Sequence, residues 1–260
     1  MSLLEHSDSK IITLTTDFGY RDPFVGQMKG VILTINRYAK IVDITHDVSS
    51  HNIEEAAFLI NESFKYFPQG SIHVVVVDPG VGSERKAIAV SSGGHYFLAP
   101  DNGVLSYLFK NNYEAVTIEN EKFVLKKNSP TFQGRDLFAP AAAWLSKGHD
   151  FRELGTPVKE PIILNIDEPL RIDNRIVGKI IYFDKFGNAI TNIKIEGEKI
   201  REICIGEHRL SIVKFYAQSP EKPAALVNSN GFLEIFAYKD SAEKTLELQK
   251  GQTVEVFIDG

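Results

Sequence analysis

The chain has 260 residues, 43% of them hydrophobic, which is enough to bury the core of one large domain or of two domains of roughly 100–150 residues. Its net charge of −5 argues against nucleic acid as a partner, because phosphate neutralisation requires a basic face. No apolar run approaches the roughly 20 residues that span a bilayer, the first ten residues are polar, and the single cysteine, Cys204, excludes an internal disulfide, so we expect a cytoplasmic protein without a membrane partner.

The first half of the sequence alternates strands with helices. Apolar β-branched runs and apolar residues at helical spacing predict a strand, a helix, a strand, a helix and a strand at residues 11–19, 24–39, 40–48, 51–67 and 71–78. This order is typical of βαβ units with right-handed crossovers, which form a parallel sheet. Shorter predicted elements complete this half, namely strands at 87–92, 95–103 and 114–120, a helix at 103–111 and an alanine-rich helix that ends at Gly148.

The second half of the sequence has a different pattern. Residues 156–169 contain three prolines and lose helical periodicity, so we place a linker there. Residues 175–195 then predict a hairpin with a glycine-containing turn, and further alternating strands separated by a polar connection follow up to residue 258. The sequence therefore predicts an α/β N-terminal domain with a mainly parallel sheet at residues 1–160 and a smaller all-β C-terminal domain at residues 161–260.

Two carboxylates stand at the carboxyl ends of predicted strands. Asp17 ends the first strand, and Asp78 ends a continuous valine run before Pro79 and Gly80 force a turn. Open α/β sheets bind ligands at this edge, and Arg85 follows closely enough to fold back onto Asp78. For the stretch from Asp78 to Arg85 alone, an equally good interpretation is that Asp78 caps the turn and Arg85 is a solvated surface charge.

Other catalytic motifs are absent or incomplete in the sequence. The segment GVGSER lacks the third glycine and the Lys-Ser/Thr pair of a phosphate loop. His46, Asp47 and His51 fit no zinc spacing, and His51 falls where a helix begins, so we favour a capping or surface role and expect no metal site. No G-x-S-x-G elbow or Cys/His pair favours covalent catalysis.

Six segments taken together resemble the S-adenosylmethionine (SAM) hydroxide adenosyltransferases, or SAM hydrolases, which are relatives of the fluorinating and chlorinating SAM enzymes. They occur in the family's order over residues 11–240: TTDFGYRDPFVGQMKG, VDPGVGSER, PDNG, TFQGRDLFAPAAAW, DKFGNAITNI and NSNGFLEIFA. The resemblance implies an α/β N-terminal domain, a barrel-like C-terminal domain, and a homotrimer that binds SAM between one subunit's N-terminal domain and its neighbour's C-terminal domain. It also implies that SAM is the substrate, that water converts it to adenosine and methionine, and that no cofactor takes part.

The resemblance assigns roles to individual residues. Asp17 matches the acid that holds the ribose hydroxyls, and Asp78 also lies beside the nucleoside. The residues that match the family's contacts in the second domain are the turn residues Asp184, Phe186 and Asn188 and, in the matching C-terminal stretch, Ser229, Glu234 and Ala237. The chemistry agrees, because carboxylates accept hydrogen bonds from a vicinal diol and an acid offsets the charge of a ligand ammonium.

One position departs from the family pattern. The family's water-activating triad is Asp, Arg and His; Asp78 and Arg85 match the first two, but Gln133 replaces the histidine. Glutamine exchanges hydrogen bonds with a water but cannot take its proton. Three hypotheses follow: a SAM hydrolase, slowed if histidine acts as a base in the relatives; a SAM- or adenosine-binding protein with little turnover; and a halide-using enzyme, disfavoured because Gly134 stands where the fluorinating enzymes carry serine.

The expected reaction expels a neutral thioether from a sulfonium at the ribose C5′, so the leaving group needs no general acid. The site must hold one water in line with the C5′–S bond and exclude bulk solvent. An aspartate paired with an arginine is a weak base, so we expect Asp78 and Arg85 to orient the water and to stabilise developing hydroxide, with Gln133 completing the cradle.

Overall fold

A computed structural model describes residues 10–126 and 129–259. The chain divides into two compact units, with the division between Leu164 and Asn165, and each unit has its own hydrophobic core. The polar residues 1–9, on which the expectation of a cytoplasmic protein partly rests, lie outside the described residues. Within the described ranges, no helix is long and apolar enough to cross a membrane.

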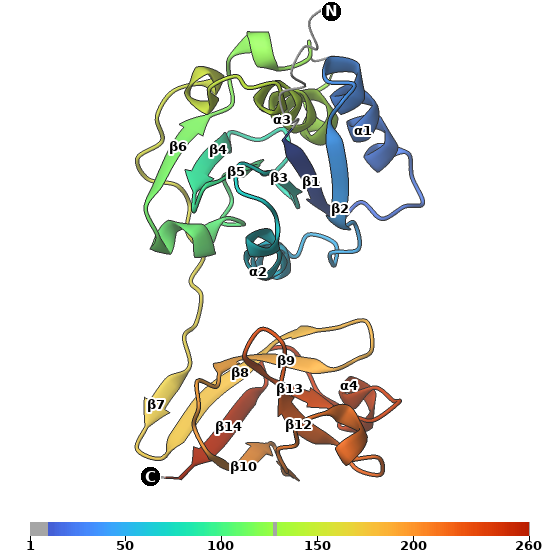
Figure 1. The fold of residues 1–260 in the computed structure, drawn as a ribbon, viewed down its shortest axis with the longest axis vertical. Coiled ribbons are helices and arrows are strands. Elements are labelled where there is room, and N and C mark those ends of the chain that lie inside the picture. Colours follow the sequence, from blue (N-terminus) through green and yellow to red (C-terminus); the bar gives the residue numbers. More distant parts are fainter. Residues whose placement is uncertain (1–9, 127–128, 260) are drawn as a thin grey trace, which may run out of the picture. The chain divides into compact units, whose positions relative to one another are not determined.

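The N-terminal unit is built on a six-stranded mixed sheet (Figure 1). Its strands lie in the order β2-β1-β3-β5-β4-β6, with the bounds β1 (Ile11–Thr16), β2 (Lys40–Thr45), β3 (Ile72–Val76), β4 (Ala87–Ser92), β5 (His95–Pro100) and β6 (Tyr113–Thr117). The pairs β2–β1, β1–β3 and β3–β5 are parallel, whereas β4 is antiparallel to β5 and β6. β4 and β5 are antiparallel because only Gly93 and Gly94 join them, which leaves no room for a crossover. The predicted α/β class is confirmed.

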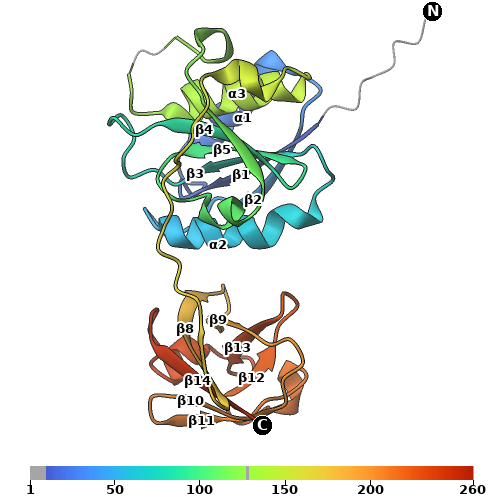
Figure 2. The same ribbon diagram turned by 90° about the vertical axis from the view of Figure 1, so that its left-hand side faces the viewer.

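Helices cover both faces of this sheet (Figure 2). α1 (Phe24–Ile35) and α3 (Ala139–Ser146) pack against each other on one face, and α2 (Ile53–Ser63) lies on the other. All five residues of β3 are consequently buried. This two-sided cover explains why the β3 sequence is a nearly continuous apolar run rather than an alternating one.

The helices differ locally from those predicted. α2 begins later than expected because the Asn52 side chain caps it, accepting a hydrogen bond from the Glu55 backbone N–H. The predicted helix at residues 103–111 is wrong, because this stretch forms only a short 3₁₀ turn, Ser106–Lys110, and is too short to repay helix nucleation. Gly134–Phe138 form a π-helical turn that leads into α3.

The C-terminal unit is all-β, as predicted. Its eight strands are β7 (Leu170–Ile172), β8 (Arg175–Phe183), β9 (Ala189–Lys194), β10 (Ile200–Ile205), β11 (His208–Leu210), β12 (Ala224–Val227), β13 (Phe232–Phe236) and β14 (Thr253–Ile258). They pair in the order β11-β10-β14-β8-β9-β13-β12, with β7 on β8. The two halves of the nine-residue β8 pair with different strands, β14 and β9, so the sheet curves around β8 into a near-barrel (Figure 1).

Four elements of this unit were not predicted from the sequence: β7, β10, β11 and the one-turn helix α4 (Ala242–Thr245). β7 and β11 have three residues each, which is too short for a periodic signal. α4 lies inside the predicted polar connection and begins where the Ser241 side chain accepts from the Lys244 backbone N–H.

A buried histidine pair predicts that the N-terminal unit loses stability in acid. His73 on β3 is fully buried; its Nδ1 lies 2.8 Å from Thr13 Oγ1 and its Nε2 lies 3.2 Å from His95 Nδ1. Burial, with a smaller contribution from His95, lowers the pKa of His73 from 6.5 to about 3. The unfolded chain therefore binds this proton at a higher pH than the folded chain does. Stability is full above a pH of about 6.5 and falls as the pH drops toward 3, by about 2 kcal/mol at pH 5.

Urea unfolding at about pH 7.5 and about pH 5 measures this loss. In His73→Gln, the difference between the two pH values should shrink because the variant lacks the titrating group. The matched control is His208→Gln, at an exposed position, which should keep the wild-type pH dependence. An unchanged difference in His73→Gln would show that another group causes the acid sensitivity.

Candidate active site

The N-terminal unit contains a cavity of about 520 Å³ at the carboxyl ends of β1 and β3. Asp17 directly follows β1, and Asp78 stands two residues after β3, so the strand ends carry both carboxylates into one site. The cavity is lined by Asp17, Phe18, Phe24, Ser50, His51, Val76, Asp78, Val81, Thr131, Phe132, Gln133 and Gly134. The structure thus brings together Asp17, Asp78 and Gln133, which sequence analysis proposed separately.

Asp78 and Arg85 form a two-pronged ion pair. Arg85 Nε donates to Asp78 Oδ1 at 3.0 Å, and Arg85 Nη2 donates to Asp78 Oδ2. Both side chains are more than nine-tenths buried. The intervening turn makes this possible, because Gly82 adopts a left-handed φ of 83° and returns the chain toward the strand end. Of the two interpretations of this stretch, the solvated surface arginine is therefore wrong.

Gln133 joins this pair through its carbonyl oxygen. Arg85 Nη2 also donates to Gln133 Oε1, at 2.5 Å. Since a guanidinium has only donors, the amide oxygen must face Arg85, and the amide NH₂ is the end of Gln133 that remains for another partner. Gln133 directly precedes the π-helical turn Gly134–Phe138 and is largely buried. The cluster of Asp78, Arg85 and Gln133 therefore offers a donor from Gln133 and carboxylate lone pairs from Asp78.

Asp17 is held by a residue that sequence analysis did not include in the site. The His51 backbone N–H donates to Asp17 Oδ2 at 2.9 Å, and His51 adopts a left-handed φ of 65°. A positive φ is unfavourable for a residue with a side chain and is typical of functional sites. Of the two roles predicted for His51, capping is wrong, because Asn52 caps α2, whereas the surface position is confirmed, because the His51 side chain is exposed. Its place in the loop that follows β2, the neighbour of β1, was the signal available in the sequence.

The other two residues that we considered as metal ligands lie outside the cavity wall. His46 is buried and paired with Thr16 and Asp43, whereas Asp47 is exposed. Among the described residues, no group of three or more His, Cys, Asp or Glu side chains is placed to hold a metal ion.

An aromatic wall closes one side of the cavity. Phe18, Phe24 and Phe132 meet edge to face, with ring centroids 5.2–5.9 Å apart. Gly134 lies against this wall: a Cβ there would stand 3.2 Å from the Phe132 ring and 3.3 Å from Met28 Sδ. The wall gives the cavity an apolar side, and its packing leaves little room for a side chain at position 134.

The C-terminal unit has a cavity of its own, of about 570 Å³. It is lined by Phe186, Asn188, Tyr216, Ala237, Tyr238, Lys239, Asp240 and Ser241. Three of the predicted binding residues, Phe186, Asn188 and Ala237, therefore lie together. The Phe186 side chain is among the most exposed large apolar groups of the unit, with 73% of its surface accessible.

Asp184 shapes the turn that carries these residues. Its carboxylate accepts hydrogen bonds from the backbone N–H groups of Phe186 and Asn188, at 2.8 and 2.9 Å, and from the Asn188 side-chain amide at 2.9 Å. Gly187 completes the turn with a φ of 79°, at a position where a Cβ would collide with Ser241. In this unit Asp184 orients Asn188, so that the amide oxygen of Asn188 remains for a ligand.

Glu234 is a buried acid beside this turn. It is 4% exposed, and the Tyr216 hydroxyl donates to its Oε1 at 2.7 Å. Burial raises the pKa of Glu234, and the charge of Asp184 raises it further, although hydrogen bonds from Tyr216 and Asn228 oppose the shift. A cationic ligand group nearby would stabilise the ionised form. No sequence pattern marked Tyr216.

Ser229 is placed apart from the other predicted binding residues. It lies in the exposed turn between β12 and β13, whereas Ala237 directly follows β13, so the whole five-residue strand separates them. Ser229 does not line the cavity that Asn188 and Ala237 share.

Comparisons with known proteins agree with both units. Residues 12–155 match the family model described as the SAM hydroxide adenosyltransferase N-terminal domain, and residues 178–255 match that of the C-terminal domain. The (R)-S-adenosyl-L-methionine hydrolase of Methanocaldococcus jannaschii is 38% identical to this chain, over 95% of each protein. The fluorinase of Nocardia brasiliensis is 26% identical, over 95% of this chain and 97% of that protein.

A solved structure gives the same result. The crystal structure of an uncharacterized conserved protein from Thermotoga maritima superposes with a TM-score of 0.89 at 32% identity, and the match covers 95% of this chain and 99% of that one. Since both domain models match in order and together span most of the sequence, the chain belongs to the SAM hydroxide adenosyltransferase family.

Proposed function

We propose that this protein hydrolyses SAM to adenosine and methionine. One arrangement supports the proposal above all: the hydrogen-bonded cluster of Asp78, Arg85 and Gln133 shares a cavity with Asp17. Attack of water on the ribose C5′ requires an anchor for the ribose and an oriented water near it. The similar protein of M. jannaschii is named as a hydrolase of SAM, which supports the same substrate here.

Asp17 is the proposed ribose ligand. Its Oδ2 accepts one hydrogen bond from the His51 backbone, so Oδ1 and a second lone pair of Oδ2 are left for the two hydroxyls of a ribose. The aromatic wall of Phe18, Phe24 and Phe132 excludes solvent around the diol, which strengthens these hydrogen bonds.

Asp78, Arg85 and Gln133 are the proposed catalytic residues. The water oxygen accepts from the Gln133 NH₂ while the water donates to Asp78, which fixes its direction of attack. As the O–C5′ bond forms, the C5′–S bond breaks and its electron pair stays on sulfur, giving neutral methionine. The water proton passes by way of Asp78 to solvent, and Arg85 stabilises the negative charge that develops on the water oxygen.

Two other functions remain as alternatives to test. A protein that binds SAM or adenosine with little turnover is favoured by Gln133, because an amide cannot accept the water proton. A halide-using enzyme is disfavoured by the packing at Gly134, because a serine side chain there would crowd Phe132 and Met28.

Incubation of the pure protein with SAM, followed by liquid chromatography, tests these functions together. Adenosine and methionine in equal amounts are the expected products. SAM recovered unchanged would support the binding protein, and a 5′-halogenated nucleoside formed in the presence of halide would support the third function. Either result would overturn the proposed hydrolysis.

We also propose that the active unit is a homotrimer in which the C-terminal unit of one subunit completes the cavity of its neighbour. Each unit has an open cavity of similar size; Asp17 and Asp78 line one, and Phe186, Asn188 and Ala237 line the other. Asn188, Glu234 and Ala237, together with Phe186 and Asp184, would then contact adenine and the methionine part, whereas Ser229 would reach the ligand only from its separate turn. The Glu234 carboxylate suits the methionine ammonium.

Mixing two inactive variants tests this shared site. Asp78→Ala removes the water-orienting acid, and Asn188→Ala removes a group of the other unit, so each variant alone should be inactive. Mixed and reassembled subunits should regain part of the activity, since some sites combine two intact halves. Sedimentation of an active monomer, or no recovery in reassembled mixtures, would contradict the shared site.

The remaining proposals concern the cellular location of the protein, its cofactors and its partners. We propose a cytoplasmic location, supported by the free thiol of Cys204, which suits a reducing compartment. We propose that no cofactor takes part, because the sulfonium of SAM already supplies a neutral leaving group. SAM and adenosine are the proposed partners, and neither nucleic acid nor membrane is among them.

A further inference from the structure

The loop that carries Asp17 is tied to the loop that follows β2. The Gly19 backbone N–H donates to the His46 carbonyl at 2.7 Å, and the Val48 N–H donates to the Thr16 carbonyl at 3.3 Å. The Phe18 N–H donates to the Thr16 hydroxyl at 3.2 Å. The chain is therefore held immediately before and immediately after position 17.

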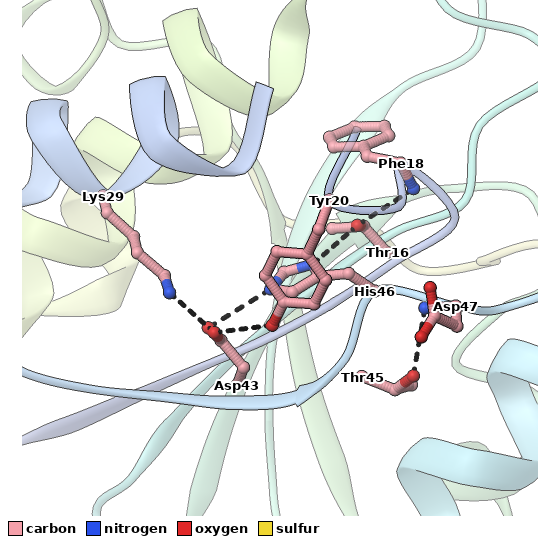
Figure 3. Close-up of polar contacts among 8 residues, drawn as sticks. All are labelled: Thr16, Phe18, Tyr20, Lys29, Asp43, Thr45, His46 and Asp47. Carbon is pink, nitrogen blue, oxygen red and sulfur yellow. Dashed lines mark hydrogen bonds and ion pairs between the residues drawn. The ribbon is translucent and has the colours of Figure 1, made fainter. Parts of the chain in front are cut away.

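A chain of polar contacts runs from this loop into the protein (Figure 3). The Phe18 N–H can only donate, so Thr16 Oγ1 accepts from it, and the same oxygen lies 2.8 Å from His46 Nδ1. Nδ1 accepts from the Thr16 hydroxyl in the tautomer that carries the ring proton on Nε2. That nitrogen lies 3.2 Å from Asp43 Oδ1.

Neighbouring donors stabilise the anionic form of Asp43, the last residue of this chain. Lys29 Nζ donates to its Oδ2 at 2.6 Å, and the Tyr20 hydroxyl donates to the same oxygen at 3.0 Å (Figure 3). Burial raises the pKa of the Asp43 carboxyl, but the contacts of the carboxylate with Lys29, His46 and Tyr20 outweigh burial and hold the pKa below its ordinary value.

Within the described structure, no hydrogen bond to another group replaces the contact between His46 and Asp43. His46 Nε2 and Asp43 Oδ1 are both buried, and neither has a well-aligned hydrogen bond among the described residues. They face each other off the line of an ideal hydrogen bond, at ion-pair distance. The Tyr20 ring, whose centroid is 5.0 Å from that of His46, packs edge-on against the imidazole.

We propose that Thr16, His46 and Asp43 are positioning residues that hold the Asp17 carboxylate ready for the ribose of the substrate. The inference rests on the proposed function, because it concerns the residue that binds the ribose. Asp43 orients the imidazole, the imidazole orients the Thr16 hydroxyl, and the hydroxyl fixes the Phe18 N–H, so the backbone at position 17 does not have to be ordered when the ligand binds. Preorganisation of this kind lowers the cost of binding.

The chain supplies a matched control on the same strand. Thr13, like Thr16, is fully buried on β1, and its hydroxyl lies 2.8 Å from a buried histidine, His73. That pair lies within the core, three residues before Thr16, and touches no residue of the Asp17 loop. Thr→Val substitution is the same chemical change at both sites. A purely structural role for the Thr16–His46 pair predicts the same consequences for both variants.

The experiment compares Thr16→Val, Thr16→Ser and Thr13→Val by three measurements: calorimetric titration with adenosine, SAM kinetics, and hydrogen exchange of the Phe18 amide. We expect Thr16→Val to raise the adenosine Kd and the KM for SAM about tenfold, the effect of one hydrogen bond, with kcat at saturation nearly unchanged. Phe18 amide protection should be lost in this variant. Thr16→Ser keeps the hydroxyl and should restore all three values, and Thr13→Val should lose stability while keeping the wild-type Kd.

The outcomes distinguish a failure of the proposed positioning role from a failure of the proposed function. A wild-type protein that binds no adenosine contradicts the proposed function itself. Two results would contradict the positioning role of Thr16, His46 and Asp43 and leave the proposed function intact. In the first, the wild type binds adenosine and folded Thr16→Val binds it equally well. In the second, Thr13→Val weakens binding as much as Thr16→Val does. If Thr16→Val does not fold, Asp43→Asn replaces it in the experiment. This variant removes the charge that orients His46, so it should raise the adenosine Kd and expose the Phe18 amide to exchange. An unchanged Kd would overturn the proposal.

Discussion

Asp17→Ala should weaken the binding of adenosine by about 10²–10³-fold, because the variant loses two charge-assisted hydrogen bonds to the ribose diol. The carboxylate is largely buried beside an aromatic wall, where water does not replace the missing acceptor. Calorimetric titration with adenosine measures the loss directly. It does so without depending on turnover.

Two further variants make this result specific. Asp17→Asn keeps the acceptor for the His51 N–H, so it should fold normally and bind with an intermediate affinity. Asp47→Ala removes an exposed carboxylate that follows the neighbouring strand β2 and should bind adenosine as the wild type does. Wild-type affinity in Asp17→Ala would remove Asp17 from the site.

Gln133→His should raise the turnover number by about 10²-fold, the lower end of what general acid–base catalysis contributes. An imidazole can take the proton that the attacking water loses, whereas the Gln133 amide cannot. The gain should appear as the pH rises through about 6.5, because only the neutral ring accepts a proton. Affinity for SAM should change little, since Asp17 and the rest of the cavity are unaltered. Initial rates across a range of about pH 6–9 measure the effect.

Thr131→His is the matched control, because Thr131 lines the same cavity and its hydroxyl pairs with that of Ser129 rather than with Arg85. It should not raise turnover, which would show that the position of the imidazole matters and not its presence. Equal turnover in wild type and Gln133→His at every pH would contradict the prediction and would mean that no proton acceptor is needed at position 133.

Much of the fold was predictable because its signals are local. The valine run of β3 stops at a turn, the helical spacing of α1 and α2 is regular, and the loss of periodicity after α3 separates an α/β half from an all-β half. Apart from the six-residue β10, the elements that were missed or wrong, such as β11 and the 3₁₀ turn Ser106–Lys110, are short. Short segments take their conformation from the strands and loops that pack against them, so their own sequence carries little signal.

The site was predictable only in part, for the same physical reason. Asp17 and Asp78 could be recognised because each stands at the end of a strand, and the carboxyl ends of parallel strands meet at one edge of a sheet. The sequence alone therefore determined the fold class, the strand-end acids and, by its motifs, the resemblance to the SAM hydrolases.

Only the tertiary structure decided which polar atoms face one another. Arg85 is paired because the turn at Gly82 reverses the chain, and Gln133 presents its NH₂ because Arg85 occupies its oxygen. His51 and His46 gained their roles from contacts across separate loops, Asp17 with the His51 backbone and Thr16 with the His46 ring. Such contacts join residues some thirty positions apart, and hydrogen-bond direction depends on the three-dimensional arrangement of donors and acceptors, which no local pattern records.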